Sequence, residues 1–251
     1  MSISAREYKQ YGCGKVFNRK PVLKKGAKII KYAIFDLDGT IFDSSEMWKT
    51  LGEEYLKLLG KTPAPDLAHR LNTMSIPESA AYIHNEYNVS YSPDEIIRHI
   101  TRMTEKYYLE QVGLKDGAPR LLAVLRAHCV RMSIATAGDA NLALSALSRL
   151  GITEFFEGAV SCSDYGAKTS PEVFLAAADI IYAIPEETMV FEDSLHAVRT
   201  AKKAGFATAA VCDVSEKNQE ELKKTADFYA LSLSELADNV TELLKFSAAR
   251  N

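Results

Sequence analysis

The stretch Phe-Asp-Leu-Asp-Gly-Thr at residues 35–40, directly after the apolar run Ile-Ile-Lys-Tyr-Ala-Ile at 29–34, decides how this chain is interpreted. The run predicts a buried strand, and two carboxylates stand where that strand gives way to a loop. Asp36 and Asp38 are two residues apart, so in extended backbone they project to the same side. Like charges held this close raise one another's pKa unless a cation or a reaction accounts for them. One Asp of such a pair can act as a nucleophile while the other transfers a proton.

The composition is that of an ordinary globular protein. The 251 residues are 47% hydrophobic and 25% charged, enough for a real core and one or two domains. No apolar run reaches the length of a membrane span, and the N-terminus lacks the apolar core of a secretory signal. The cysteines show no CxxC or metal-type spacing, so we expect free thiols and a cytoplasmic location. They are Cys13, Cys129, Cys162 and Cys212.

The net charge of −3 conceals a basic N-terminal extension at residues 1–28. Residues 1–31 hold nine Lys and Arg against the single acid Glu7, whereas the rest holds 21 against 32. One interpretation is an arm for nucleic acid or an acidic partner, and the other is a plain terminal extension. We favour the second, because an arm this short with no fold motif is weak evidence for nucleic-acid binding.

Apolar strands alternate with amphipathic helices after residue 28, which predicts an α/β fold: a parallel sheet with helices on both faces. The expected strands are 29–36, 130–136, 158–162, 187–192, 206–212 and 226–230. The expected helices are 117–128, 140–150, 171–183, 195–204, 217–224 and 233–246.

Residues 45–112 break this alternation, because they contain only helical patterns. Capping boxes are expected at Ser75 with Glu78 and at Ser92 with Glu95. The segment is too long for a simple crossover between strands. We therefore expect a catalytic core formed by residues 29–44 and 115–251, with an inserted helical cap at 45–114.

Polar side chains follow several of the predicted strands where each strand ends. They are Asp36 and Asp38, Thr136, Lys168, and Glu192 with Asp193, and Ala137 adds a free backbone amide after Thr136. Parallel strands bring such ends to one edge of the sheet, where ligands of these folds bind. Several carboxylates around a point attract Mg²⁺, and a Lys with a Thr hydroxyl suits phosphate oxygens. Taken singly, each residue has a plainer interpretation as a turn, a helix cap or a surface charge.

The set DxDGT, a strand-terminal Thr, a Lys before a Pro-opened helix, and Glu-Asp-Ser resembles the haloacid dehalogenase superfamily. The match in order and spacing covers residues 29–44 and 115–230. The helical insert resembles the C1-type cap of the subfamily that contains β-phosphoglucomutase and phosphoglycolate phosphatase. The resemblance implies a Rossmann-like core, a Mg²⁺ cofactor and hydrolysis of a phosphoric monoester.

The resemblance also implies a role for each motif residue. Asp36 would form an aspartyl-phosphate, and Asp38 would act as general acid and base. Thr136, Ala137 and Lys168 would bind the phosphoryl group. Asp36, the Asp38 carbonyl and Asp193 would hold Mg²⁺, with Glu192 binding directly or through water.

The cap residues expected to meet the substrate are Trp48, Asn72, Thr73 and Ser75, together with Glu46, Met47 and Met74. Phosphomutases of the β-phosphoglucomutase type hold a second phosphate with an Arg after a cap Ser. Ile76 stands at that place here and cannot bind a phosphate. This favours a phosphatase over a mutase.

Three functions stay open on the sequence. The first is a phosphatase of a small phosphorylated metabolite such as a sugar phosphate, a nucleotide or a phosphoglycolate-like compound. The second is a phosphomutase. The third is a non-catalytic binding protein that uses the basic arm. We expect a monomer or weak dimer with no membrane association and no nucleic-acid partner.

Overall fold

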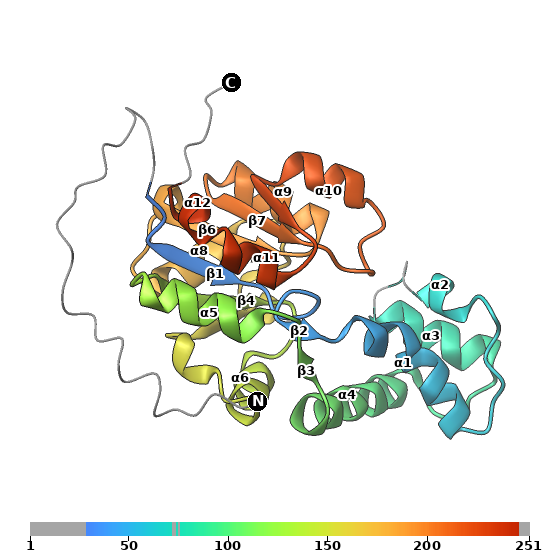
Figure 1. Cartoon of the computed structure of the whole chain (residues 1–251). Coiled ribbons are helices and arrows are strands. Elements are labelled where there is room, and N and C mark those ends of the chain that lie inside the picture. Colours follow the sequence, from blue (N-terminus) through green and yellow to red (C-terminus); the bar gives the residue numbers. More distant parts are fainter. Residues whose placement is uncertain (1–28, 72–73, 75, 246–251) are drawn as a thin grey trace.

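The computed structural model describes residues 29–71, 74 and 76–245. Figure 1 shows a sheet with helices on both faces, and a group of helices, α1 to α4, set to one side of it. The sheet has six strands in the order β5-β4-β1-β6-β7-β8, all parallel. The predicted α/β fold class is confirmed.

All six predicted strands are present, although the structure trims their ends. They are β1 (Tyr32–Phe35), β4 (Arg131–Thr136), β5 (Ala159–Ser161), β6 (Thr188–Glu192), β7 (Ala207–Val211) and β8 (Phe228–Ala230). The strand β1 lies between β4 and β6, with Phe35 in register with both Ile134 and Phe191. The chain that carries residues 36–40 therefore leaves the sheet at its centre.

Alternating side chains of β1 pack against two separate helical layers. Ala33 and Phe35 belong to the larger core, where the rings of Phe35 and Phe191 stack with centroids 4.3 Å apart. Ile34 faces the opposite layer, which includes Phe174. The first layer comprises α5 (Ala118–Ala127), α6 (Ala140–Arg149), α11 (Leu233–Asp238) and α12 (Val240–Leu244). The second comprises α8 (Glu172–Ile180) and α9 (Leu195–Lys203).

Two further helices of the core lie outside these layers, and one predicted helix is divided. The helix α10 (Gln219–Thr225) packs against α9 and β8, and the short α7 (Cys162–Tyr165) follows β5. The expected single helix at 233–246 is wrong in detail, because α11 ends at Asp238 and α12 begins at Val240.

The four helices α1 (Ser45–Leu58), α2 (Leu67–Leu71), α3 (Ile76–Glu86) and α4 (Pro93–Glu110) form a helical unit with its own apolar cluster, which includes Tyr55, Leu67 and Ile96. The predicted capping box of Ser92 and Glu95 is confirmed. The other predicted box lies outside the described residues, because it requires Ser75. The exact domain boundaries stay a prediction.

Two short strands, β2 (Phe42–Asp43) and β3 (Gly113–Leu114), pair antiparallel where the chain enters and leaves the helical unit. Two residues are too few to produce a periodic pattern, so these strands could not be predicted from the sequence. Asp213, which follows β7, links both of these chain segments to the core. It accepts from Ser45 Oγ at 2.6 Å and pairs with Lys115 Nζ at 2.6 Å.

Cys162 and Cys212 carry free thiols, as expected. The expectation is wrong for Cys129, which is disulfide-bonded. Across the described part of the chain, every helix is too short or too polar to cross a membrane.

The Asp213 carboxylate is expected to stabilise the fold in a pH-dependent manner. Burial alone would raise the pKa of Asp213, but hydrogen bonds from Lys115, Ser45 and Ser215 outweigh it and lower the pKa to about 2. A carboxyl with a depressed pKa in the folded state stabilises it above the unfolded pKa near 4, and this stability is lost as the pH falls towards 2. Asp213→Asn should lower the free energy of unfolding at pH 7 by about 2 kcal/mol.

Urea unfolding of both proteins between pH 7 and 2 measures this effect. The free energy of the variant should fall less steeply below pH 4, so that the two proteins converge. Parallel curves would show that Asp213 is not the group responsible.

Candidate active site

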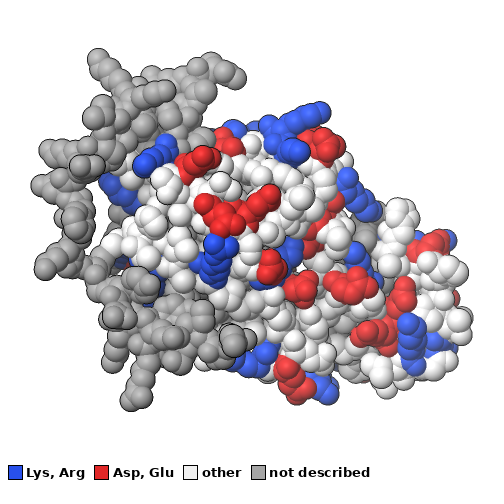
Figure 2. Space-filling view, in the orientation of Figure 1, with Lys and Arg blue, Asp and Glu red and all other residues white. Residues whose placement is uncertain are grey.

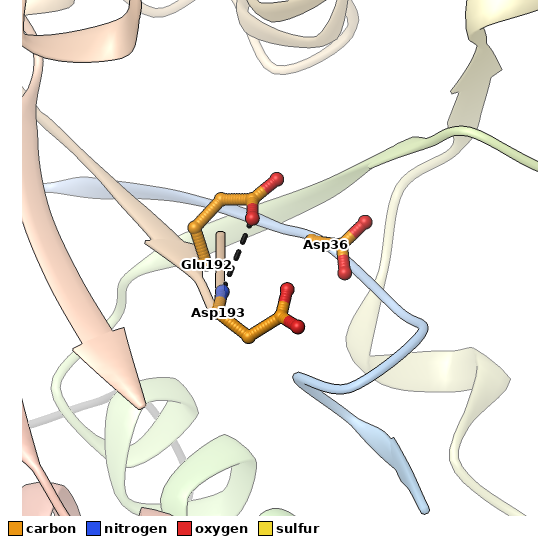
Figure 3. A group of neighbouring side chains, drawn as sticks. All are labelled: Asp36, Glu192 and Asp193. Atoms are coloured by element: carbon orange, nitrogen blue, oxygen red, sulfur yellow. Dashed lines mark hydrogen bonds between the residues drawn. The ribbon is translucent and has the colours of Figure 1, made fainter. Parts of the chain in front are cut away.

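Three carboxylates converge where β1 and β6 end side by side. The Asp36 N–H donates to the carbonyl of Phe191 at 3.0 Å, which extends the β1–β6 ladder by one residue. Glu192 is the last residue of β6, and Asp193 follows it. Figure 3 shows the side chains of Asp36, Glu192 and Asp193 gathered at this edge. All three are buried, and each offers an oxygen within 4.8 Å of the others.

Lys168 lies among these carboxylates and is only 6% exposed. Its Nζ donates to Asp36 Oδ1 and, at 2.6 Å, to Glu192 Oε1. Burial alone would lower the pKa of Lys168, but the charges of Asp36 and Glu192 outweigh burial and raise it. The ammonium group is therefore a permanent positive charge in this site.

Glu192 has donors on both of its carboxylate oxygens. Its Oε2 accepts from the N–H groups of Asp193 and Ser194, both at 3.1 Å, and from Ser194 Oγ at 3.0 Å. Burial opposes its ionisation, but Lys168 and these donors lower the pKa of Glu192. Glu192 thus holds Lys168 and the loop after β6 in place. Because both of its oxygens already accept hydrogen bonds, Glu192 fits better as a metal ligand that acts through a water molecule than as a direct ligand.

Lys168 offsets only part of the negative charge of the other two carboxylates, Asp36 and Asp193. Burial, reinforced by Glu192 and Asp38, raises the pKa of Asp36 to about 7 despite the opposing charge of Lys168. Burial and the nearby acids also raise the pKa of Asp193 well above its usual range. One ammonium group facing three carboxylates leaves an excess of negative charge, and a divalent cation with oxygen ligands fits this set.

Gly39 provides the space that this cluster needs. Its backbone has φ of +80°, and a Cβ at this position would lie 2.4 Å from Oδ2 of Asp193. Only glycine combines this conformation with such a close approach at little cost. The motif glycine therefore lets the loop after β1 fold against Asp193.

Asp38 lies in a different environment from Asp36. Three donors meet at its Oδ1: Ser44 Oγ at 2.6 Å, Trp48 Nε1 at 3.4 Å, and the hydroxyl of Tyr108. The side chain of Asp38 is half-buried and lines a cleft of about 480 Å³ between α4 and α6. Asp38 is thus accessible to a substrate, whereas Asp36 is buried and does not line the cleft.

The structure places the predicted phosphate-binding residues at the same edge. Thr136 ends β4, is buried, lines the cleft and accepts from the Gly138 N–H at 3.1 Å through Oγ1. Ala137 follows directly and is exposed. Lys168 contacts Asp36 as described above. The catalytic and binding roles of these residues stay predictions.

The cap side of the cleft differs from the expected set. Trp48 lines the cleft, as predicted, whereas Asn72, Thr73 and Ser75 lie outside the described residues. The wall is instead formed by α4 through Thr101, Thr104, Glu105 and Tyr108, opposite α6. These positions share one face of a helix, a spacing visible in the sequence but not assigned to the site. No pattern could link Tyr108 to Asp38, because they are 70 residues apart.

Comparisons with known proteins agree with this geometry. The sequence model of the haloacid dehalogenase-like hydrolases matches residues 33–211, most of the chain. The chain belongs to this family. The enzyme is 24% identical over 174 residues to a phosphorylated carbohydrates phosphatase of Thermotoga maritima, covering 69% of this chain and 81% of the relative. It is 27% identical over 191 residues to a probable pseudouridine-5'-phosphatase of Drosophila melanogaster, covering 73% and 82%.

Solved structures of the same fold include a putative beta-phosphoglucomutase from Thermotoga maritima. It has a TM-score of 0.76 at 22% identity and covers 86% of this chain and 100% of its own. CbbY from Rhodobacter sphaeroides, solved in complex with phosphate, has a TM-score of 0.69 at 24% identity and covers 83% and 96%. At these identities the likeness establishes the shared fold.

Gly39→Ala tests the close approach of the loop to Asp193. The new Cβ would combine the positive φ with a clash, so we expect the free energy of unfolding to fall by about 2–4 kcal/mol. Gly60→Ala is the matched control, because Gly60 has φ of +70° but nothing within 4 Å of an added Cβ. It should cost only about 1 kcal/mol. Equal losses in urea unfolding would mean that the contact with Asp193 is unimportant.

Proposed function

We propose that the enzyme is a Mg²⁺-dependent phosphatase of a small phosphorylated metabolite that works through an aspartyl-phosphate on Asp36. The observation that carries the proposal is the contact of Lys168 with Asp36 inside a buried carboxylate cluster, beside a cleft that exposes Asp38. Nucleophile, proton carrier and charge-neutralising groups are the parts that phosphoryl transfer requires. Both relatives named above are described as phosphatases.

Asp36 and Asp38 would divide the reaction into two displacements. In the first, an oxygen of Asp36 bonds to phosphorus while the ester P–O bond breaks, and Asp38 gives its proton to the departing oxygen. In the second, a water oxygen attacks the same phosphorus while Asp38 takes a proton from that water. The bond to Asp36 then breaks, which releases phosphate and restores both carboxyl groups.

The charged residues around Asp36 would make this approach possible. Asp36, Asp193 and the Asp38 carbonyl would hold Mg²⁺, with Glu192 acting through water. When bound, the ion supplies positive charge that offsets the repulsion between a carboxylate and a phosphate. Lys168, the Thr136 hydroxyl and the Ala137 N–H would bind the phosphoryl oxygens.

The composition of the cleft favours a phosphatase over a phosphomutase. A mutase must hold a second phosphate, for which Arg or Lys is the usual partner. Among the described residues that line the cleft, none is Lys, Arg or His. Ile76, at the place where the mutases carry an Arg, lines an apolar cavity of about 250 Å³ in the helical unit.

The third candidate, a binding protein that uses the basic arm, receives no support from the described part of the chain. Residues 29–245 hold 21 Lys and Arg against 32 Asp and Glu. Figure 2 shows acidic and basic side chains mixed over one face of the molecule, without a continuous basic area there. The excess of negative charge over residues 29–245 repels a polyanion. Residues 1–28 lie outside the described residues. The cytoplasmic location and the monomeric or weakly dimeric state stay predictions.

The cleft also favours a leaving group without a negative charge. Glu105 on α4 and Asp139 at the start of α6 line it. The hydroxyls of Thr101 and Ser145 and the amide of Asn141 offer hydrogen bonds to a hydroxyl-rich substrate. A sugar or nucleoside monophosphate suits these walls better than a bisphosphate or a phosphoglycolate-like acid.

Asp36→Asn should abolish release of phosphate from p-nitrophenyl phosphate, because the amide cannot attack phosphorus. Wild-type turnover should require Mg²⁺ and stop when the ion is removed by a chelator. Asp43→Asn is the control, because this nearby carboxylate is exposed and should be dispensable. Turnover by Asp36→Asn near the wild-type rate would refute the nucleophile, and turnover unaffected by the chelator would refute the metal.

The preference of the cleft for an uncharged leaving group is tested with 2-hydroxyethyl phosphate and phosphoglycolate. The first carries a hydroxymethyl group where the second carries a carboxylate. The wild type should prefer the neutral leaving group in kcat/KM, and Glu105→Gln should narrow the preference by about 3- to 10-fold. Glu110→Gln is the matched control on the same helix, because Glu110 is exposed and does not line the cleft. An unchanged ratio in Glu105→Gln would show that this carboxylate does not select the substrate.

A further inference from the structure

The crowding of donors on one oxygen of Asp38 has a chemical consequence. Ser44, Trp48 and Tyr108 all donate to Oδ1. A carboxyl oxygen that accepts several hydrogen bonds has no lone pair left to bind a proton. In the proposed reaction, the other oxygen, Oδ2, is therefore the one free to exchange a proton. The three donors thus select which oxygen delivers a proton and also fix the orientation of the carboxyl group.

Tyr108 is held in place by packing of its ring and by hydrogen bonds to its backbone. It is 6% exposed near the end of α4, and its ring packs edge-on against Phe42 with centroids 5.8 Å apart. Arg149 of α6 donates through Nη2 to the carbonyls of Tyr108 at 3.1 Å and Val112 at 2.5 Å. The last turn of α4 is therefore fixed to the core.

We propose that Tyr108 is a positioning residue that orients Asp38 so that its proton reaches the leaving-group oxygen. This inference rests on the proposed phosphatase reaction, and it assigns to the end of α4 a task that the motif residues do not perform. Ser44 and Trp48 lie at the start of α1, where the chain enters the helical unit. Tyr108 lies near the end of α4, where the chain leaves it, so it is the donor that reaches Asp38 from that side. The orientation of Asp38 then depends on both segments that join the helical unit to the core.

The surroundings keep Tyr108 in the state that this task needs. Burial and the charge of Asp38 raise the pKa of Tyr108, so its hydroxyl remains protonated and donates. Replacing this hydroxyl by a hydrogen atom leaves Asp38 with two donors, both from one end of the helical unit. The carboxyl group can then rotate away from the position needed for proton transfer, while the nucleophile is untouched.

Tyr108→Phe distinguishes positioning from packing through its dependence on the leaving group. An alkyl phosphate such as 2-hydroxyethyl phosphate needs a proton as it leaves, whereas p-nitrophenolate leaves without one. The kcat/KM for the alkyl ester should fall by about 10- to 100-fold, and that for p-nitrophenyl phosphate by less than about 3-fold. Tyr107→Phe is the matched control, because its hydroxyl donates instead to the Asp43 carbonyl at 3.2 Å.

A second measurement places the effect on Asp38. In an Asp38→Ala background, adding Tyr108→Phe should change the single-turnover release of ethylene glycol from 2-hydroxyethyl phosphate by less than about 2-fold, because the group that Tyr108 positions is gone. Equal losses on both esters in the single variant, or no loss on either, would overturn the proposal. A wild type that hydrolyses no phosphate ester would instead refute the proposed function, so the two failures are distinguishable.

Discussion

Lys168, buried among three carboxylates, is the interaction on which the rest of the site depends. Its ammonium group bonds to Asp36 and Glu192 and connects the loop before α8 with the ends of two strands. A buried ion pair gains little net stability, because desolvation of the charges offsets their attraction. The arrangement is therefore better explained by chemistry than by folding. It keeps three carboxylates and one ammonium group within one small volume.

The order of the strands provides the geometry for this cluster. Because β1 lies between β4 and β6, the chain ends that carry Asp36, Thr136 and Glu192 are neighbours at one edge of the sheet. Phe35 and Phe191 stack beneath that edge and fix the two central strands relative to each other. The apolar core thus determines the distance between carboxylates that would repel one another in a less constrained fold.

The fold and the central cluster were predictable because they are recorded in local patterns. Alternating apolar runs located the six strands, and polar residues that follow four of these strands pointed to a common edge. The features missed were those without a local pattern. The pairing of β2 with β3 involves two residues each, and the contact of Tyr108 with Asp38 spans the whole helical unit. The polar face of α4 was visible, but only the packing of α4 against α6 makes it a cleft wall.

The two aspartates of the motif are identical side chains in different environments. Asp36 is buried beside Lys168 and has a pKa raised to about 7, so its charge depends on nearby cations. Asp38 is half-exposed and is surrounded by hydroxyl and indole donors from the two ends of the helical unit. A nucleophile needs its charge neutralised as phosphate approaches, whereas a proton carrier needs a fixed orientation and access to the leaving group. The sheet supplies the first environment, and the segments that join it to the helical unit supply the second. In the proposed reaction, the separate roles of Asp36 and Asp38 would therefore follow from where the insert joins the core.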